Sequence, residues 1–101
     1  MNERQKWFCR HYLDTSVGSE AARLAGYKAK CPANYAYRLL QQANIQSRLM
    51  MLMKENEREL ELTCQRGFQK LFTELKTTDD FYMKNNTYKK IKSLINFMEE
   101  L

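Results

Sequence analysis

A short set of polar and basic side chains recurs along one predicted helix, and their chemistry suits contact with nucleic acid. Asn34, Arg38 and Gln41 follow one another at intervals of four and three residues, which places them on one helical face together with Tyr37. Amide and guanidinium groups make the hydrogen bonds that base edges and phosphates offer. A solvated helix face is the alternative interpretation of this pattern. The opposite, buried face is predicted to carry Ala36, Leu39, Leu40 and Ala43.

Three helices are needed to position this face. The first is predicted from about Glu3 to Asp14. A second begins at Ser19, whose hydroxyl is predicted to cap it, and ends at Gly26 in the left-handed conformation. Pro32 opens the third, which continues to Ala43. Two short helices joined in this way are typical of a helix-turn-helix unit, which places one helix in a DNA groove.

The first helix carries an aromatic face. Trp7, Phe8, His11 and Tyr12 fall at helical spacing, and we expect Trp7, Tyr12 and also Tyr27 to be core side chains rather than platforms for base stacking. His11 is the single histidine, and we expect it to pack in the core rather than to act in catalysis.

The positive charge of the chain is concentrated in its first half. The net charge is +5 over 101 residues. Residues 1–50 carry eight basic and three acidic side chains, whereas residues 51–101 carry nine of each. A local basic excess favours binding to a polyanion. The charge therefore adds to the helix-turn-helix pattern as an indication of DNA binding.

The second half carries long apolar stripes at helical spacing. Asn44 is predicted to cap a fourth helix with Ile45, Leu49, Leu52 and Met53 along one side. A further stripe runs from residue 60 to residue 75 with Gly67 inside it, and a last one runs from residue 88 to residue 98. Breaks are predicted at residues 77–80, where the two aspartates can cap the next helix, and at residues 85–87.

Few glycines and prolines together with these stripes predict an all-α fold. We expect a helix-turn-helix three-helix unit over residues 1–53 and a helical oligomerisation or partner-binding region over residues 54–101. Apolar stripes must pack on something, either the first unit or other subunits. The side chains predicted at subunit contacts are Leu60, Phe68, Leu71, Phe72, Leu75, Ile91, Leu94, Ile95 and Met98.

Several functional classes are not indicated. Gly18, Gly26 and Gly67 are isolated, so no phosphate-binding glycine loop is present, and we expect no enzyme and no cofactor. Three widely spaced cysteines without a C-x-x-C pair predict free thiols in a reducing cytoplasm and no metal site. We expect no signal peptide, because residues 1–6 lead into mixed polarity, and no membrane span, because no apolar run is long enough.

Several elements in this order resemble the small subunit of phage terminases over roughly residues 3–53. They are the run Arg4 to Leu13, the helix Ser19 to Ala25, Ala25-Gly26-Tyr27, and Arg38-Leu39-Leu40 followed by Asn44-Ile45 and Arg48. The resemblance implies a helix-turn-helix DNA-binding region and helices that build a ring-shaped oligomer. It also implies that the protein recognises the packaging site on viral DNA and recruits the large subunit, which holds the ATPase and nuclease, in the host bacterial cytoplasm. Many relatives continue into a C-terminal β segment, for which this chain has no strand signal.

Under this interpretation the partners are double-stranded DNA, further copies of the chain and the large subunit. A small transcriptional regulator with a helical dimerisation tail is the alternative, and a pure interaction protein that has lost DNA binding is a third. The side chains expected to contact DNA are Asn34, Arg38 and Gln41 in the groove, Tyr37 on the same helical face, and Lys6, Arg10, Arg23, Lys28 and Lys30 at phosphates.

Overall fold

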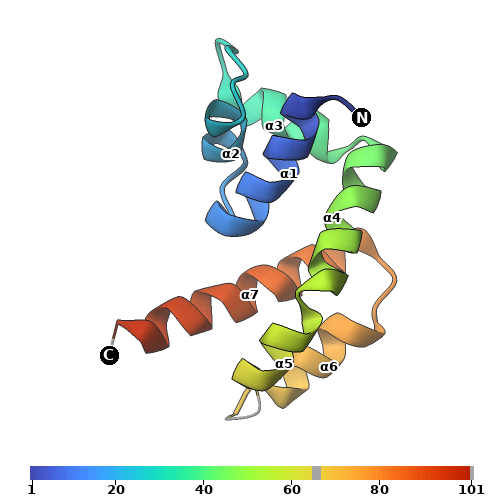
Figure 1. Cartoon of the computed structure of the whole chain (residues 1–101), viewed down its shortest axis with the longest axis vertical. Coiled ribbons are helices and arrows are strands. Elements are labelled where there is room, and N and C mark those ends of the chain that lie inside the picture. Colours follow the sequence, from blue (N-terminus) through green and yellow to red (C-terminus); the bar gives the residue numbers. More distant parts are fainter. Residues whose placement is uncertain (65–66, 101) are drawn as a thin grey trace. The chain divides into compact units, whose positions relative to one another are not determined.

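The computed structural model describes residues 1–64 and 67–100, and every regular element in that part of the chain is an α-helix, as predicted (Figure 1). The chain forms two compact units, Met1–Leu52 and Met53–Leu101. Helix α4, Ala43–Glu55, belongs to both units, since the boundary falls within it.

Helix α1, Glu3–Thr15, contributes four buried side chains to the core of the first unit. It begins with a capping box that the sequence did not lead us to expect: Asn2 Oδ1 accepts the Gln5 N–H at 2.8 Å, and Gln5 Oε1 accepts the Asn2 N–H at 3.1 Å. The helix ends at Ser16, which adopts a left-handed conformation. The buried side chains are Phe8, Cys9, Tyr12 and Leu13.

One expectation about the α1 aromatic face was wrong. The Trp7 side chain is 51% exposed and stacks on His11, with ring centroids 5.7 Å apart. His11 itself is only half-buried. The buried face of α1 is narrower than the run of aromatic residues indicates, and of the four aromatic side chains only Phe8 and Tyr12 are buried in it. Tyr27 is half-buried against Tyr35.

Helix α2, Gly18–Leu24, begins one residue before the predicted start. Its N-cap is Val17, with no side-chain capping hydrogen bond, so the predicted Ser19 cap is wrong. The first turn of α2 packs closely on α3. A Cβ atom on Gly18 would lie 2.9 Å from the Ala36 Cβ atom, so a glycine is required where the first turn of α2 meets α3.

The end of α2 follows the predicted glycine stop. Gly26 has a φ of 95°, and its N–H donates to the Arg23 carbonyl at 3.1 Å. The Tyr27 N–H donates to the Ala22 carbonyl at 3.1 Å, which completes a Schellman motif. The chain is thereby turned sharply before residues 27–31.

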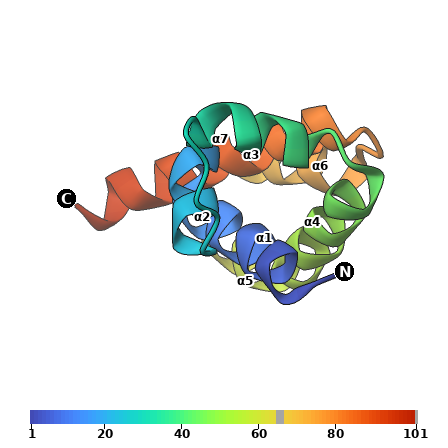
Figure 2. The same cartoon turned by 90° about the horizontal axis from the view of Figure 1, so that it is seen from above.

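Helix α3, Pro32–Leu40, has proline in its first turn, as predicted, and lies beside α2 in both views of the chain (Figures 1 and 2). It ends three residues early, because the Gln41 and Gln42 N–H groups donate to the carbonyls of Arg38 and Leu39 and tighten the last turn. Ala43 therefore opens α4 and is exposed rather than buried. Asn44 lies inside α4 and its Oδ1 accepts the neighbouring Ile45 N–H, so it is not the predicted cap.

The second unit contains α5, Glu57–Cys64, α6, Gln69–Thr77, and α7, Phe81–Glu99. The predicted stripe over residues 60–75 is divided between α5 and α6, and Gly67 lies between these helices with a φ of 146°. Asp80 caps α7 as predicted, since its carboxylate accepts the Met83 N–H at 3.1 Å.

The predicted break at residues 85–87 does not occur, because α7 continues through it. Asn85 is buried, and immediately before it the Lys84 ammonium donates to the Leu75 carbonyl of α6 at 3.0 Å. Lys84 also lies 3.7 Å from Glu57 of α5. Buried contacts at the start of the polar run thus hold it in the helix against its weak propensity.

Candidate nucleic-acid interface

The outward face of α3 carries polar and aromatic side chains along its length. Asn34, Tyr37, Arg38 and Gln41 are all exposed, and Tyr37 is 66% exposed. The buried side of the helix contains Ala36 and Leu39, which pack the unit. Gln41 lies just beyond the last helical residue, as the C-cap. The buried side of α3 thus fixes the helix on the first unit, and its exposed side presents hydrogen-bonding side chains to solvent. Helices that contact base edges in the major groove have this arrangement.

A basic depression lies beside α3, between its exposed face, the segment before it and the start of α1. It has a volume of about 530 Å³ and four cationic side chains line it: Arg4, Lys28, Lys30 and Arg38. Tyr27, Tyr35, Gly26 and Ala29 complete the lining, and none of these described residues carries a carboxylate. Four cations without a counter-charge in the lining create a positive potential that favours phosphate.

The aromatic rings of the depression position one of its cations. Tyr27 and Tyr35 pack with their centroids 4.8 Å apart, and the Arg38 guanidinium carbon lies 5.6 Å from the centroid of the Tyr35 ring. This cation–π contact restrains a long side chain at the edge of the α3 face. Burial raises the pKa of Tyr27, with a smaller raising effect from Tyr35, so its hydroxyl stays neutral and adds no negative charge to the depression.

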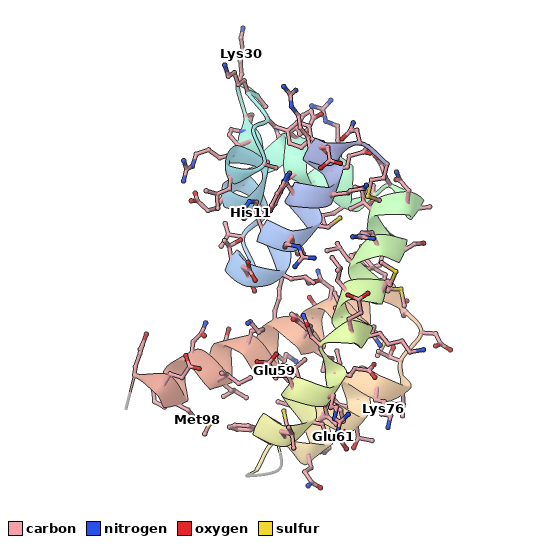
Figure 3. All side chains as sticks on the ribbon, in the orientation of Figure 1. His11, Lys30, Glu59, Glu61, Lys76 and Met98 are labelled. Carbon is pink, nitrogen blue, oxygen red and sulfur yellow. The ribbon has the colours of Figure 1, made fainter. Side chains whose placement is uncertain are left out.

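The structure thus brings three of the predicted basic residues together and leaves three elsewhere. Lys28, Lys30 and Arg38 share the depression, and Lys30 points away from the helices at the tip of its segment (Figure 3). Lys6, Arg10 and Arg23 are exposed but do not line it. Lys6 lies 3.7 Å from Glu3, and Arg23 forms an ion pair with Glu20.

Arg23 is already neutralised by Glu20 within α2. Hydrogen bonding from Arg23 lowers the pKa of Glu20, so the carboxylate remains charged beside the guanidinium. A cation already paired in this way releases fewer counterions when it meets a phosphate.

Sequence reasoning missed Arg4 and Tyr35 as members of this site. Arg4 lies on α1, more than twenty residues from the other cations, and only the packing of the unit brings it to them. Its place in the first turn of an exposed helix end gave no signal of its own. Tyr35 was detectable in principle, since it precedes Arg38 by three residues on the same helix.

The predicted subunit-contact residues separate into two groups. Leu60, Phe72, Leu75 and Ile91 are buried and pack the second unit itself, so their side chains are not on its surface. Phe68, Leu71, Leu94 and Ile95 are half-buried, and Met98 is 38% exposed. The second group alone presents apolar surface to another molecule.

Neither a metal site nor a membrane span is found in the described part of the chain. Residues 1–64 and 67–100 contain no cluster of three or more metal-ligating side chains. No helix over the same residues is long and apolar enough to cross a bilayer. The cysteines are free, with Cys9 and Cys64 buried, as predicted, and Cys31 exposed.

Comparison with known proteins identifies one family. A family model described as terminase small subunit matches residues 1–98. No curated protein and no solved structure matches the chain. The match extends over both units, well past the segment that carries the resemblance in the sequence.

Proposed function

Because this chain belongs to the terminase small subunit family, we propose that its first unit binds duplex DNA through α3 and the basic depression. In this proposal α3 enters the major groove, with Asn34, Arg38 and Gln41 at base edges, while Lys28, Lys30 and Arg4 contact the phosphates beside it. The helix-turn-helix region corresponds to residues 1–53. The target is the packaging site on viral DNA.

The observation that carries the proposal is the position of the basic depression beside the polar face of α3. The first unit holds the whole net charge of +5, and four of its eight cations line one depression without a carboxylate. The basic side chains supply contacts to the phosphates, which do not depend on the DNA sequence. The adjacent helix supplies contacts to base edges, which do depend on it.

We further propose that residues 54–101 hold several copies together and that the assembly recruits and regulates the large ATPase–nuclease subunit in the host cytoplasm. A single head makes few contacts and binds weakly. Linked heads raise the effective concentration at neighbouring sites, so assembly compensates for the weak individual contact. The chain itself has no catalytic role in this proposal.

A DNA titration tests the proposal. Arg38→Glu is expected to weaken binding to a duplex that contains the packaging site at least about tenfold at low salt, since it removes one cation and adds a repelling charge. Arg58→Glu is the matched control: Arg58 is an exposed arginine on α5, outside the site. Unchanged affinity in Arg38→Glu, with circular dichroism that confirms the helices, would remove α3 from the interface.

A further inference from the structure

The tryptophan of α1 forms an exposed aromatic platform on the first unit. The Trp7 side chain is 51% exposed, and its ring stacks on that of His11 with centroids 5.7 Å apart and planes inclined at 26°. His11 follows four residues later on the same helix and is itself half-buried, so it supports the indole from one side. A ring that is restrained on one side and open on the other can stack on a further planar group.

This platform adjoins the basic depression. Arg4, which lines the depression, precedes Trp7 by three residues on α1, about 4.5 Å along the helix axis, and therefore lies on the same side of the helix. Arg10 follows Trp7 by three residues and is exposed as well. The acid nearest to Trp7 along the chain, Glu3, lies 3.7 Å from Lys6. Cations thus precede and follow the exposed ring along α1.

A ring between cations complements one chemical class, the unpaired nucleotide. Proteins that bind single-stranded DNA combine aromatic side chains, on which bases stack, with positive charge that follows the phosphates. Inside a duplex each base is covered by its neighbours, so an exposed ring on a helix surface has no open base face to contact. Trp7 also lies on α1, whereas α3 is the helix assigned to the major groove. The platform therefore fits a base outside the duplex.

We propose that Trp7 stacks on an unpaired base of a DNA strand that continues beyond the duplex bound at α3, while Arg4 contacts the adjoining phosphate. The inference deepens the proposed DNA binding and rests on it: α3 and the depression hold the duplex, and Trp7 holds a base past its end. Stacking of this kind tolerates any base, because every base has a planar face. The first unit is accordingly expected to prefer a duplex with a single-stranded overhang to a blunt one.

Fluorescence of the full chain tests the stacking directly, because Trp7 is the single tryptophan of the sequence. The titrants are a blunt duplex of about one helical turn, the same duplex with a short thymidine overhang, and the same duplex with an abasic overhang. The abasic overhang keeps the phosphates and lacks the bases. We expect strong quenching with the thymidine overhang and little with the other two. Equal quenching by all three, or none by the thymidine overhang, would overturn the inference.

Anisotropy of labelled DNA measures the accompanying affinity. The thymidine overhang is expected to tighten binding at least about fivefold over the blunt duplex, since loss of one stacked aromatic commonly costs at least this much. Trp7→Ala should abolish the difference and leave blunt-duplex affinity unchanged, while Trp7→Phe retains part of it. The matched control is Phe97→Ala, which removes a ring that is 61% exposed in the second unit and should change neither affinity.

Two outcomes for Trp7→Ala would contradict the inference, with circular dichroism confirming its helices. An overhang preference that persists shows that another group holds the base. Equal weakening of blunt and overhang binding shows that Trp7 supports the unit and does not contact an unpaired base.

Blunt-duplex binding keeps this inference distinct from the proposed function. A chain that binds the blunt duplex and gains nothing from the overhang refutes the role of Trp7 alone. A chain that binds single-stranded DNA with Trp7 quenching and does not bind the blunt duplex refutes the duplex proposal and supports the platform. A chain that binds neither refutes both. Arg38→Glu is expected to weaken binding to both duplexes and to preserve the difference between them.

Discussion

The salt dependence of DNA binding is the prediction that depends most closely on the basic depression. If Arg4, Lys28 and Lys30 each neutralise a phosphate while Arg38 contacts a base edge, log K falls with log salt at a slope of about −2.7, since each phosphate contact contributes about −0.9. Between about 50 and 200 mM salt this slope corresponds to a loss of about 40-fold in affinity. Substituting Lys28→Ala and Lys30→Ala together leaves one phosphate contact, a slope of about −0.9 and a loss of about 3.5-fold over the same range.

Fluorescence anisotropy measures this slope with a labelled duplex of about one helical turn, which accommodates one head and excludes the effect of linked heads. The control carries Lys54→Ala and Lys70→Ala, two exposed lysines outside the depression. A wild-type slope in the Lys28/Lys30 variant, or an equal reduction in the control, would refute the assignment of these lysines to phosphates.

The remaining predictions concern stability and thiol chemistry. Gly18→Ala is expected to lower the free energy of unfolding, measured by thermal denaturation, by about 1–3 kcal/mol, because the new methyl group contacts Ala36. Ser19→Ala changes that free energy by less than about 0.5 kcal/mol, because the Ser19 side chain does not cap α2. Equal effects of the two substitutions would contradict the close packing at Gly18. Lys84→Met is expected to lower the free energy of unfolding by about 2–3 kcal/mol, because it leaves the Leu75 carbonyl and Glu57 without their cation. The control Lys90→Met is expected to change it almost not at all. An unchanged stability in Lys84→Met would show that the Lys84–Glu57 pair adds no stability. Iodoacetamide at about pH 8 should modify Cys31 first, because burial raises the pKa of Cys9 to about 11 and keeps it a thiol. Between about pH 9 and 11 the Cys9 thiol loses its proton in the unfolded chain but keeps it in the folded one. The free energy of unfolding should therefore fall more steeply with pH over this range in the wild type than in Cys9→Ala. Equal pH dependence in the two proteins would argue against the burial of Cys9.

Local signals in the sequence predicted the elements of the first unit well. Pro32 marks the start of α3 and Gly26 the end of α2 because of their own backbone conformational preferences. These two helix ends could therefore be predicted without knowledge of the fold. The start of α2 could not be placed in this way, because Gly18 is required by the approach of Ala36 from another helix. The continuity of α7 was missed for a related reason. Lys84 and Asn85 are polar residue types that are usually exposed to solvent, and only the folded structure shows that they are buried within the second unit.

The candidate site shows the same division. Periodicity predicted the polar face of α3, since one helix determines which of its side chains share a side. The basic depression joins three separate segments, so Arg4 could not be assigned, and Lys6 and Arg10 could not be separated from Lys28 and Lys30 by charge alone. Trp7 was expected in the core because it falls at helical spacing with Phe8 and Tyr12, but the width of a buried stripe depends on what packs against it.

In our proposal, α3 and the adjacent basic depression form the DNA-binding surface. A titration of the isotopically labelled full chain with duplex DNA, followed through backbone amide NMR signals, tests this claim most directly. We expect the largest shifts at residues 26–41 and at Arg4, with signals of α7 unmoved by a one-turn duplex. Binding that shifts other residues and leaves α3 unchanged, or a spectrum that does not respond to DNA at low salt, would contradict the claim.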